Sequence, residues 1–277
     1  ILVWRYIPLI QGSIIAFQDY SVVKESKFVG LTNFANILFD KAWWMAMWRT
    51  LHYMGIMVVL GFFPPIMLAI LLQEVSKGKV IYRTLYYLPA VMTGVVVLFL
   101  WKMMYDKSPE GLLNQVIGLV GIKPQRWIED TRLAMVCCIL PMVWAGLGPG
   151  CLIYLAALKS IPNEMYEAAD IDGASFVGKI QHIVVPSLKG IIMIQFINFF
   201  IKSAQNAGYI LIMTFGGPAE ATNVAGFEIF KQAYVYLKFG TATAMSWTLA
   251  SMLLGFTVIQ MKRLSRMEFR AAASKEG

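Results

Sequence analysis

Long apolar stretches separated by shorter polar ones dominate this chain. Five of them are each close to the ~20 residues that a helix needs to cross a bilayer. They lie at about residues 47–73, 80–101, 133–158, 188–214 and 241–261. A shorter apolar stretch, residues 1–17, begins without a start methionine, and we expect it to be the remainder of a truncated first helix. The pattern predicts an all-α integral membrane protein with about six helices in a single domain over residues 1–277.

The composition supports a membrane protein. Hydrophobic residues make up 58% of the chain and charged residues 14%, and the mean hydropathy is +0.63. Soluble domains usually have about 45–50% apolar and about 25% charged residues. The excess of Lys+Arg 24 over Asp+Glu 16 therefore points to anionic lipid and to membrane topology, and we expect no nucleic-acid partner.

Helix-breaking residues fall inside the apolar stretches. They are Pro64-Pro65, Pro89 and Gly148-Pro149-Gly150. We expect them to kink their helices, because proline removes a backbone donor and clashes with the preceding turn. Such breaks are tolerated in a bilayer where neighbouring helices or a water-filled path satisfy the freed backbone groups. This favours a transporter bundle over a simple membrane scaffold.

Residues for catalysis or metal binding are not apparent in the sequence. Cys137, Cys138 and Cys151 share one apolar stretch, where thiols behave as small hydrophobes. His52 and His182 are far apart and lack ligand-like companions. The chain has no Gly-rich phosphate loop followed by Lys and Ser/Thr, and no set of nucleophile, base and orienting group. We expect no enzyme activity, no metal and no cofactor in this chain.

A polar segment at about residues 159–187 separates two apolar stretches and still has helical order. Ser160, just before Pro162, is a plausible helix start, and Gly173 would let the chain turn into a second short helix. The residues spaced to share one helical face are Tyr166, Ala169, Gly173 and Phe176. The segment could dock onto another protein, or it could be an ordinary amphipathic helix on the membrane surface.

The spacing within this segment is specific. Glu167-Ala168-Ala169 is followed, after three intervening residues, by Gly173, and then by Ile183 and Pro186. This pattern resembles the cytoplasmic loop of the permease subunits of ATP-binding-cassette (ABC) importers. The resemblance implies a type I ABC importer transmembrane fold in which this loop is a coupling helix against an ATPase subunit. The residues it implies for coupling are Glu167, Ala168, Ala169, Asp172, Gly173 and Pro186.

Shorter matches to the same family occur in the expected order. They are Phe28 to Phe34, Tyr82 to Pro89, and Gly216-Gly217-Pro218 followed by Ala221-Thr222. All three resemble segments of sugar-importer permeases of the maltose-importer type, and together with the coupling loop they cover nearly the entire chain. Basic residues divide evenly between the two sides of the membrane, so the resemblance decides the orientation. It places the coupling loop and a tail at about residues 262–277 in the cytoplasm.

The resemblance also implies partners. We expect a second, related but different permease subunit, two ATPase subunits that bind ATP and Mg, and a periplasmic or extracellular solute-binding protein. The expected location is the bacterial inner membrane. The expected mechanism is alternating access, in which nucleotide-driven closure of the ATPases biases the bundle between two states.

Polar residues interrupt the apolar stretch at 188–214. They are Gln195, Asn198, Lys202, Gln205, Asn206 and Tyr209. Their spacing predicts one continuous helical face. A lysine in the middle of a span costs about 2.5–3.5 kcal/mol on insertion scales, so this face should line the bundle interior. Amides and an aromatic ring suit sugars, although a structural network that pairs Lys202 with a neighbouring helix is the alternative.

Lys202 departs from the family pattern, in which a small residue is common at this position. No acidic residue lies deep in a predicted span. One hypothesis is that the cargo is an acidic oligosaccharide, such as alginate or another uronate, whose carboxylate passes Lys202. The rival class is a secondary transporter driven by an ion gradient, which would require internal repeats and usually a buried carboxylate. Residues that could add to the lining are Trp144, Tyr154, Thr241, Thr243, Ser246 and Thr248.

Overall fold

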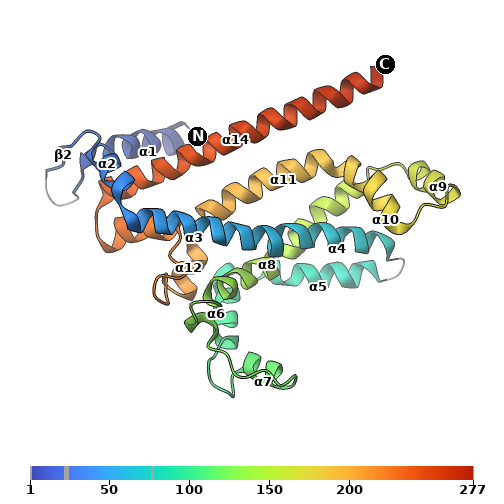
Figure 1. Ribbon diagram of the computed structural model, residues 1–277, viewed down its shortest axis with the longest axis horizontal. Helices are drawn as coiled ribbons and strands as arrows, with labels where there is room; N and C mark the ends of the chain where they lie inside the picture. Colours follow the sequence, from blue (N-terminus) through green and yellow to red (C-terminus); the bar gives the residue numbers. More distant parts are fainter. Residues whose placement is uncertain (1, 22–24, 76–77, 277) are drawn as a thin grey trace. The chain divides into compact units, whose positions relative to one another are not determined.

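The computed structural model describes residues 2–21, 25–75 and 78–276, and these fold mostly into helices (Figure 1). Two short strands, β1 (Gln18–Asp19) and β2 (Lys27–Phe28), form an antiparallel pair. The expectation of a helical membrane fold is confirmed. The chain divides into two compact units, one made of residues 1–53, 129–135 and 201–277, the other of residues 54–128 and 136–200.

The membrane-spanning helices agree with the apolar stretches of the sequence. Four helices are long and apolar enough to cross a bilayer, and a bent helix pair raises the number to as many as five in the described part of the chain. The four are Lys41–Glu74, Ala134–Leu158, Phe176–Gln205 and Phe239–Ser265. The remaining stretch forms α1 (Leu2–Ile15), whose 14 residues are fewer than the ~20 that a span needs.

The first unit is built around the last helix. Its α14 packs against α1, α2 and α13. Fully buried side chains of this unit include Trp43, Tyr53 and Phe227. The unit contains α1, α2 (Thr32–Phe39), most of α3 (Lys41–Met57), α12 (Gly208–Met213), α13 (Ala225–Phe230), a π-helix (Lys231–Val235) and α14 (Phe239–Glu276).

The segment from Phe28 to Phe34 secures the beginning of this unit. The side-chain amide of Asn33, which is buried, donates to the carbonyl oxygens of Ala16 and Gln18, each at 2.9 Å. On α14, a Cβ at Gly240 would lie 2.0 Å from the Gln18 oxygen. Glycine is therefore required there, because the helix backbone approaches β1 directly.

The second unit contains the remaining helices. Its core joins Ala69 and Leu72 of α4 to Tyr154 and Leu158 of α8, and adds Ile183 from a π-helix (Ile180–Val184). The helices are α4 (Phe63–Glu74), α5 (Lys79–Val91), α6 (Gly94–Met104), α7 (Leu112–Gly118), α8 (Ala134–Leu158), α9 (Asn163–Ile171), α10 (Phe176–Lys179) and the first part of α11 (Val185–Gln205).

The predicted kinks are realised at only one of the three positions. Beyond Pro89, α5 ends at Val91, and α6 then continues at 95° to it (Figure 1). Gly148-Pro149-Gly150 lies inside α8, which is not interrupted. Pro64 and Pro65 lie in the first turn of α4, and a π-helix (Val58–Phe62) joins α4 to α3 as one helix from Lys41 to Glu74.

Small residues let α5 and α8 approach closely. A Cβ at Gly148 would lie 2.4 Å from the carbonyl oxygen of Tyr86. Since lipid tails are as apolar as side chains, helix association in a bilayer depends on such close packing rather than on exclusion of water.

Replacing Gly148 with Ala should therefore destabilise the protein by about 1–3 kcal/mol, because the added methyl group overpacks the contact with Tyr86. Gly146 on the same helix is the matched control, since nothing lies within 4 Å of its Cβ position. There alanine should be neutral or stabilise by about 0.5–1 kcal/mol. The thermal unfolding midpoint in detergent measures both variants, and equal midpoints would contradict the close contact.

Candidate functional site

The candidate coupling segment begins with α9 (Asn163–Ile171), whose first residue directly follows Pro162. The sequence suggested Ser160 as the helix start, and this was wrong. The Ser160 hydroxyl donates to the Ala157 oxygen at 2.7 Å, so it belongs to the last turn of α8. Pro162 itself occupies the N-cap position with an extended backbone, and α9 starts at Asn163.

One side of α9 is anchored to the core of the second unit. Tyr166 and Ala169 pack against the cluster formed by α4 and α8. The Tyr166 hydroxyl also accepts a hydrogen bond from the side-chain amide of Gln73 at 3.5 Å. The two other residues predicted for this face, Gly173 and Phe176, are exposed and lie beyond the end of α9. The shared face therefore extends over α9 alone, because the helix ends at Ile171.

The opposite side of α9 is open. Glu167, Ala168, Asp172 and Gly173 are all exposed. Ile171, at the end of the helix, exposes 87% of its surface. An exposed isoleucine between carboxylates is a surface suited to a partner groove that offers an apolar pocket and basic side chains.

A glycine turn fixes the direction of the chain after α9. Gly173 has φ +71°, a left-handed conformation that only glycine adopts without steric cost. The Ala174 amide donates to the Ala169 oxygen at 2.8 Å, which closes the turn. Ser175 then caps α10 by accepting from the Gly178 amide at 3.2 Å.

An ion pair and a continuous helix connect this turn to the membrane. The Lys179 ammonium on α10 donates to the Asp170 carboxylate on α9. From Phe176 the helix continues through the π-helix Ile180–Val184 into α11 and ends at Gln205. Pro186 lies within this continuous helix. A displacement of α9 could therefore be transmitted along α11.

The polar residues of α11 do not form one uninterrupted helical face. The sequence predicted a helix through residue 214, but α11 ends at Gln205 and α12 begins at Gly208. Asn206 and Ala207 lie in the gap, and Tyr209 is on the separate helix. Asparagine and glycine favour helix ends, which explains the break and corrects the prediction.

The six polar residues predicted for this face differ in exposure. Asn198, Lys202 and Gln205 are exposed, in line with Gly190 and Ile194 on one side of α11. The half-buried residues are Gln195, Asn206 and Tyr209. Within the described residues, no carboxylate lies within ion-pair distance of the Lys202 ammonium. The described part of this chain thus supplies no carboxylate partner for the structural alternative.

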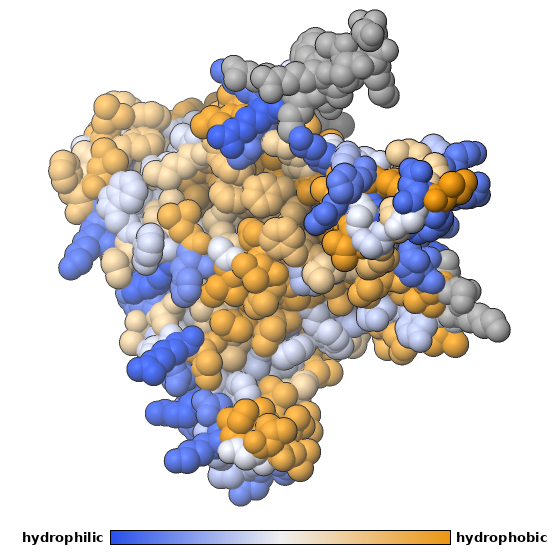
Figure 2. Space-filling model, turned by 45° about the vertical axis from the view of Figure 1, so that its right-hand side comes forward, coloured by the Kyte–Doolittle hydropathy of each residue, from blue (hydrophilic) through white to orange (hydrophobic). Residues whose placement is uncertain are grey.

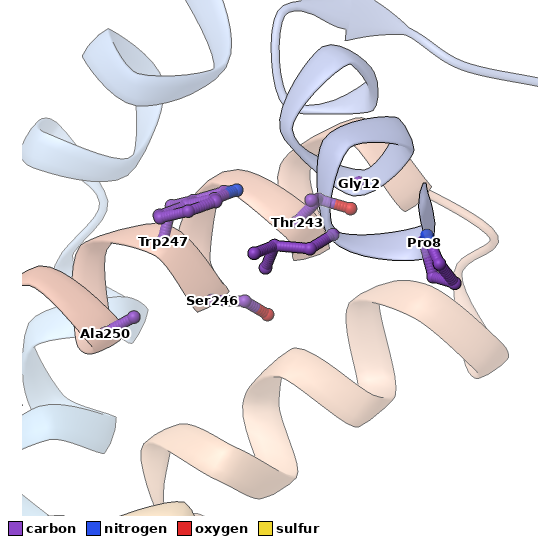
Figure 3. A pocket seen from close by; sticks show the side chains of 7 residues that line it. Pro8, Gly12, Thr243, Ser246, Trp247 and Ala250 are labelled. Carbon is purple, nitrogen blue, oxygen red and sulfur yellow. The ribbon is translucent and has the colours of Figure 1, made fainter. Parts of the chain in front are cut away.

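The hydroxyl groups of α14 are satisfied within their own helix. Thr243 donates to the Phe239 oxygen and Ser246 to the Ala242 oxygen, at 2.8 and 2.9 Å. Both line a cavity of about 240 Å³ between α14 and α1, with Trp247 on its wall (Figure 3). The cavity is mostly apolar, so these hydroxyls serve helix packing there.

Metal ligands do not assemble in the described part of the chain. No group of three or more His, Cys, Asp or Glu side chains is positioned to hold an ion there. His182 Nδ1 contacts the Gly178 oxygen at 3.0 Å, and His52 is exposed.

Sequence reasoning missed a second polar cluster. Glu228 on α13 is 3% exposed, and Asn223 and Lys231 bond to its carboxylate. The apolar pattern did not single out this glutamate, which lies between two predicted spans. The spacing of Glu228, Lys231 and Gln232, which places them on one helical face, was the available signal.

Comparison with known protein families identifies the kind of protein that carries this arrangement. Residues 48–265 match the family "Binding-protein-dependent transport system inner membrane component". The chain belongs to this family. It is therefore the permease component of a binding-protein-dependent ABC transport system, a multi-pass and non-catalytic subunit of the inner membrane. This confirms the resemblance inferred from residues 167–186.

Similar sequences cover almost the whole chain. The probable ABC transporter permease protein YesP of Bacillus subtilis is 31% identical over 95% of this chain and 86% of its own length. The trehalose/maltose transport system permease protein MalF of Thermococcus litoralis is 28% identical over 88% of this chain and 82% of its own length.

A solved structure has the same fold. The crystal structure of a bacterial ABC transporter involved in the import of the acidic polysaccharide alginate contains a chain with a TM-score of 0.85 to this one. The match covers 96% of this chain and 91% of that chain at 24% identity. The likeness confirms the importer permease fold and carries no information on cargo.

Gly173→Ala should loosen the junction of α9 and α10. A left-handed conformation costs an L-residue roughly 1–2 kcal/mol, and the space around the Gly173 Cβ position is empty, so backbone strain is the sole penalty. Amide hydrogen exchange across residues 163–180 should accelerate by about five- to thirtyfold. Gly190→Ala, also in open space but in ordinary helix, should leave exchange unchanged. Equal exchange in both variants would remove the role assigned to this turn.

Proposed function

We propose that this chain is one of two related but different permease subunits of an ATP-driven importer of sugars or oligosaccharides. A solute-binding protein delivers the cargo from the periplasm, and two ATPase subunits bind ATP and Mg on the cytoplasmic side. The observation that carries the proposal is the continuous helix from Phe176 to Gln205. It joins an exposed acidic segment to a row of polar side chains.

In this proposal, α9 is the coupling helix. Glu167, Ala168, Asp172 and Gly173 meet a groove on one ATPase subunit, and Ile171 enters its apolar part. Tyr166 and Ala169 hold the opposite side of α9 to the core, so α9 moves with the second unit. The ion pair of Asp170 with Lys179 and the helix through Pro186 carry the displacement to α11. ATPase closure thereby biases the permease between two states.

The polar residues around the end of α11 form the cargo path in this proposal. Amides donate to and accept from sugar hydroxyls, and the Tyr209 ring can pack on the apolar face of a pyranose. Relatives support a sugar cargo. The MalF protein of Thermococcus litoralis is named for trehalose and maltose, and the AraP protein of Halalkalibacterium halodurans, 28% identical over 91% of this chain and 72% of its own length, is named for arabinooligosaccharides.

Lys202 favours an acidic sugar as cargo. Its ammonium is exposed and has no carboxylate partner among the described residues. Such a charge near a span is stabilised by water or by an anion. An acidic oligosaccharide would supply that anion transiently as it passes.

The energy source is tested in vesicles that contain the complete transporter with its binding protein. Uptake of a labelled oligosaccharide should require ATP inside the vesicle and should be absent with only a proton or sodium gradient. A catalytic substitution in the ATPase subunits is the control and should abolish uptake. Uptake with the gradient alone would instead support the ion-driven secondary transporter.

Lys202→Met tests the acidic cargo in the same vesicles. Uptake of a uronate oligosaccharide should fall about tenfold, since a hydrogen bond to a charged group contributes about 1.5–3 kcal/mol. Uptake of a neutral oligosaccharide and assembly with the ATPases should stay unchanged. Lys189→Met removes an exposed charge near the start of the same helix and is the matched control. Unchanged uronate uptake in the Lys202 variant would exclude this role.

A further inference from the structure

A pocket with mainly apolar walls and several charged and amide side chains lies between Phe215 and Tyr236, within the first unit. Its volume is about 220 Å³. One span, the helix ending at Gln205, separates this segment from α9 in the chain. Its walls include Phe215, Glu220, Asn223, Phe227, Lys231 and Tyr236.

Buried hydrogen bonds hold the frame of this pocket. The hydroxyls of Thr214 and Thr222 are 2.7 Å apart, and Thr222 also donates to the Gly217 oxygen at 2.7 Å. Gly216 has φ +82°, and a Cβ there would lie 2.5 Å from the Phe227 ring. No side chain fits at Gly216, so the loop backbone packs directly against the Phe227 ring.

The Glu228 carboxylate holds two residues of the pocket wall, Asn223 and Lys231, in place. It accepts from the Asn223 amide at 2.8 Å, the Lys231 ammonium at 2.9 Å and the Gln232 amide at 2.9 Å. Burial by itself would raise the pKa of Glu228, but the hydrogen bonds from these donors outweigh it and lower the pKa. The carboxylate is consequently ionised at neutral pH and balances the charge of Lys231.

The charges around the pocket cancel. The Glu220 carboxylate lies 3.7 Å from the Lys231 ammonium and 3.6 Å from the Arg49 guanidinium. With Glu228, two carboxylates face two cations. Lys231 already contacts two carboxylates, and the more exposed Glu220 stands at the pocket wall. The described residues of the pocket therefore offer an anion no unpaired cation, and the Glu220 carboxylate stands at the wall that the anion would approach.

One polar atom in the pocket lacks a partner. The side chain of Asn223 uses its amide nitrogen for Glu228, while its Oδ1 is buried and accepts no hydrogen bond. The residue is 1% exposed. A buried acceptor without a donor destabilises the fold, because it has lost its hydrogen bond to water. A hydroxyl group entering the pocket would supply the missing donor.

Aromatic rings complete the walls. Phe215 and Phe227 meet edge to face with centroids 5.3 Å apart, and Tyr236 also lines the pocket. Phe215, Ala219 and Glu220 have φ of 51°, 45° and 60°. Non-glycine residues in this left-handed region are strained, and such strain is characteristic of ligand sites.

We propose that this pocket binds one neutral sugar ring of the cargo, outside the path along α11. The inference rests on the proposed function, which supplies the sugar. A hydroxyl donates to Asn223 Oδ1, and the apolar face of the ring packs against Phe215. The volume is below the ~300–1,000 Å³ of ordinary ligand pockets, so it admits a single ring rather than a chain.

The test measures binding of methyl glucoside and of glucuronate to the transporter assembled with its partner permease and ATPases, without binding protein. Saturation-transfer NMR gives the affinities, and an Asn198→Leu background weakens binding in the proposed path. Phe215→Ala should weaken methyl glucoside binding by about three- to tenfold. Phe39→Ala is the matched control, since Phe39 is an exposed phenylalanine remote from the pocket lining, and its affinity should equal that of the parent.

Glu220→Gln supplies an independent measurement that preserves side-chain shape. The substitution removes the repulsive carboxylate and frees Lys231 from one of its pairs. Glucuronate binding should improve by about two- to fivefold, while methyl glucoside binding should stay the same. Glucuronate binding more tightly than methyl glucoside in the parent would overturn the neutral-ring assignment. Equal methyl glucoside affinity in the parent and Phe215→Ala would overturn the site.

The two proposals can fail separately. Loss of ATP-driven uptake in vesicles with pocket binding intact would reject the importer function alone. Intact uptake, together with methyl glucoside binding that Phe215→Ala leaves unchanged, would reject the pocket alone.

Discussion

Backbone hydrogen bonding inside a bilayer is the constraint on which the rest of this structure depends. Hydrocarbon offers no donors or acceptors, so each spanning segment must satisfy its own backbone groups. Prolines threaten this, because each lacks an N–H and clashes with the carbonyl four residues earlier. In this chain the π-helix Val58–Phe62 contains the residues four before Pro64 and Pro65, and the π-helix Ile180–Val184 contains the residue four before Pro186. The wider turns of these two π-helices therefore lie at the carbonyl groups that would otherwise clash with the prolines.

This accommodation has a consequence for transmission. If Pro186 broke its helix, movement of α10 would be absorbed at the break. Because the π-helix accepts the proline, the helix stays continuous from Phe176 to Gln205. In the proposed coupling, α9 moves together with this helix. Tyr166 and Ala169 hold α9 to the core, and Ile171 is exposed at its end.

Much of the fold could be predicted from the sequence, because spanning helices leave a strong signal. The apolar stretches at 47–73, 133–158 and 241–261 lie within the observed spans. What failed was local. Ser160 was assigned to the wrong helix, since a serine hydroxyl bonds equally well to a preceding carbonyl. The face shared by Gly173 and Phe176 was overextended, because periodicity does not reveal where a helix ends.

The candidate sites show the same division. The candidate coupling segment could be predicted because its residues are consecutive and their spacing is specific, and its role in coupling stays a prediction. The Glu228 cluster was missed because its stability comes from burial, and hydrophobic patterning does not predict a buried, neutralised carboxylate between two spans. The Thr50 hydroxyl, on α3, accepts a hydrogen bond from the Ala225 amide at 2.8 Å, three residues before Glu228. A contact between residues that are 175 positions apart in the chain produces no pattern in the local sequence.

The break after Gln205 finally connects the backbone constraint to the polar row of α11. Non-helical backbone near a bilayer is tolerated only where protein covers it or water reaches it. The backbone of Gly226 packs against the end of α11, since a Cβ on Gly226 would lie 3.2 Å from the Gln205 carbonyl oxygen. Lys202 and Gln205, however, are exposed just before the break. A helix end and an ammonium both require polar surroundings, so their coincidence indicates a hydrated region at this end of α11, as a path for a hydrophilic cargo demands.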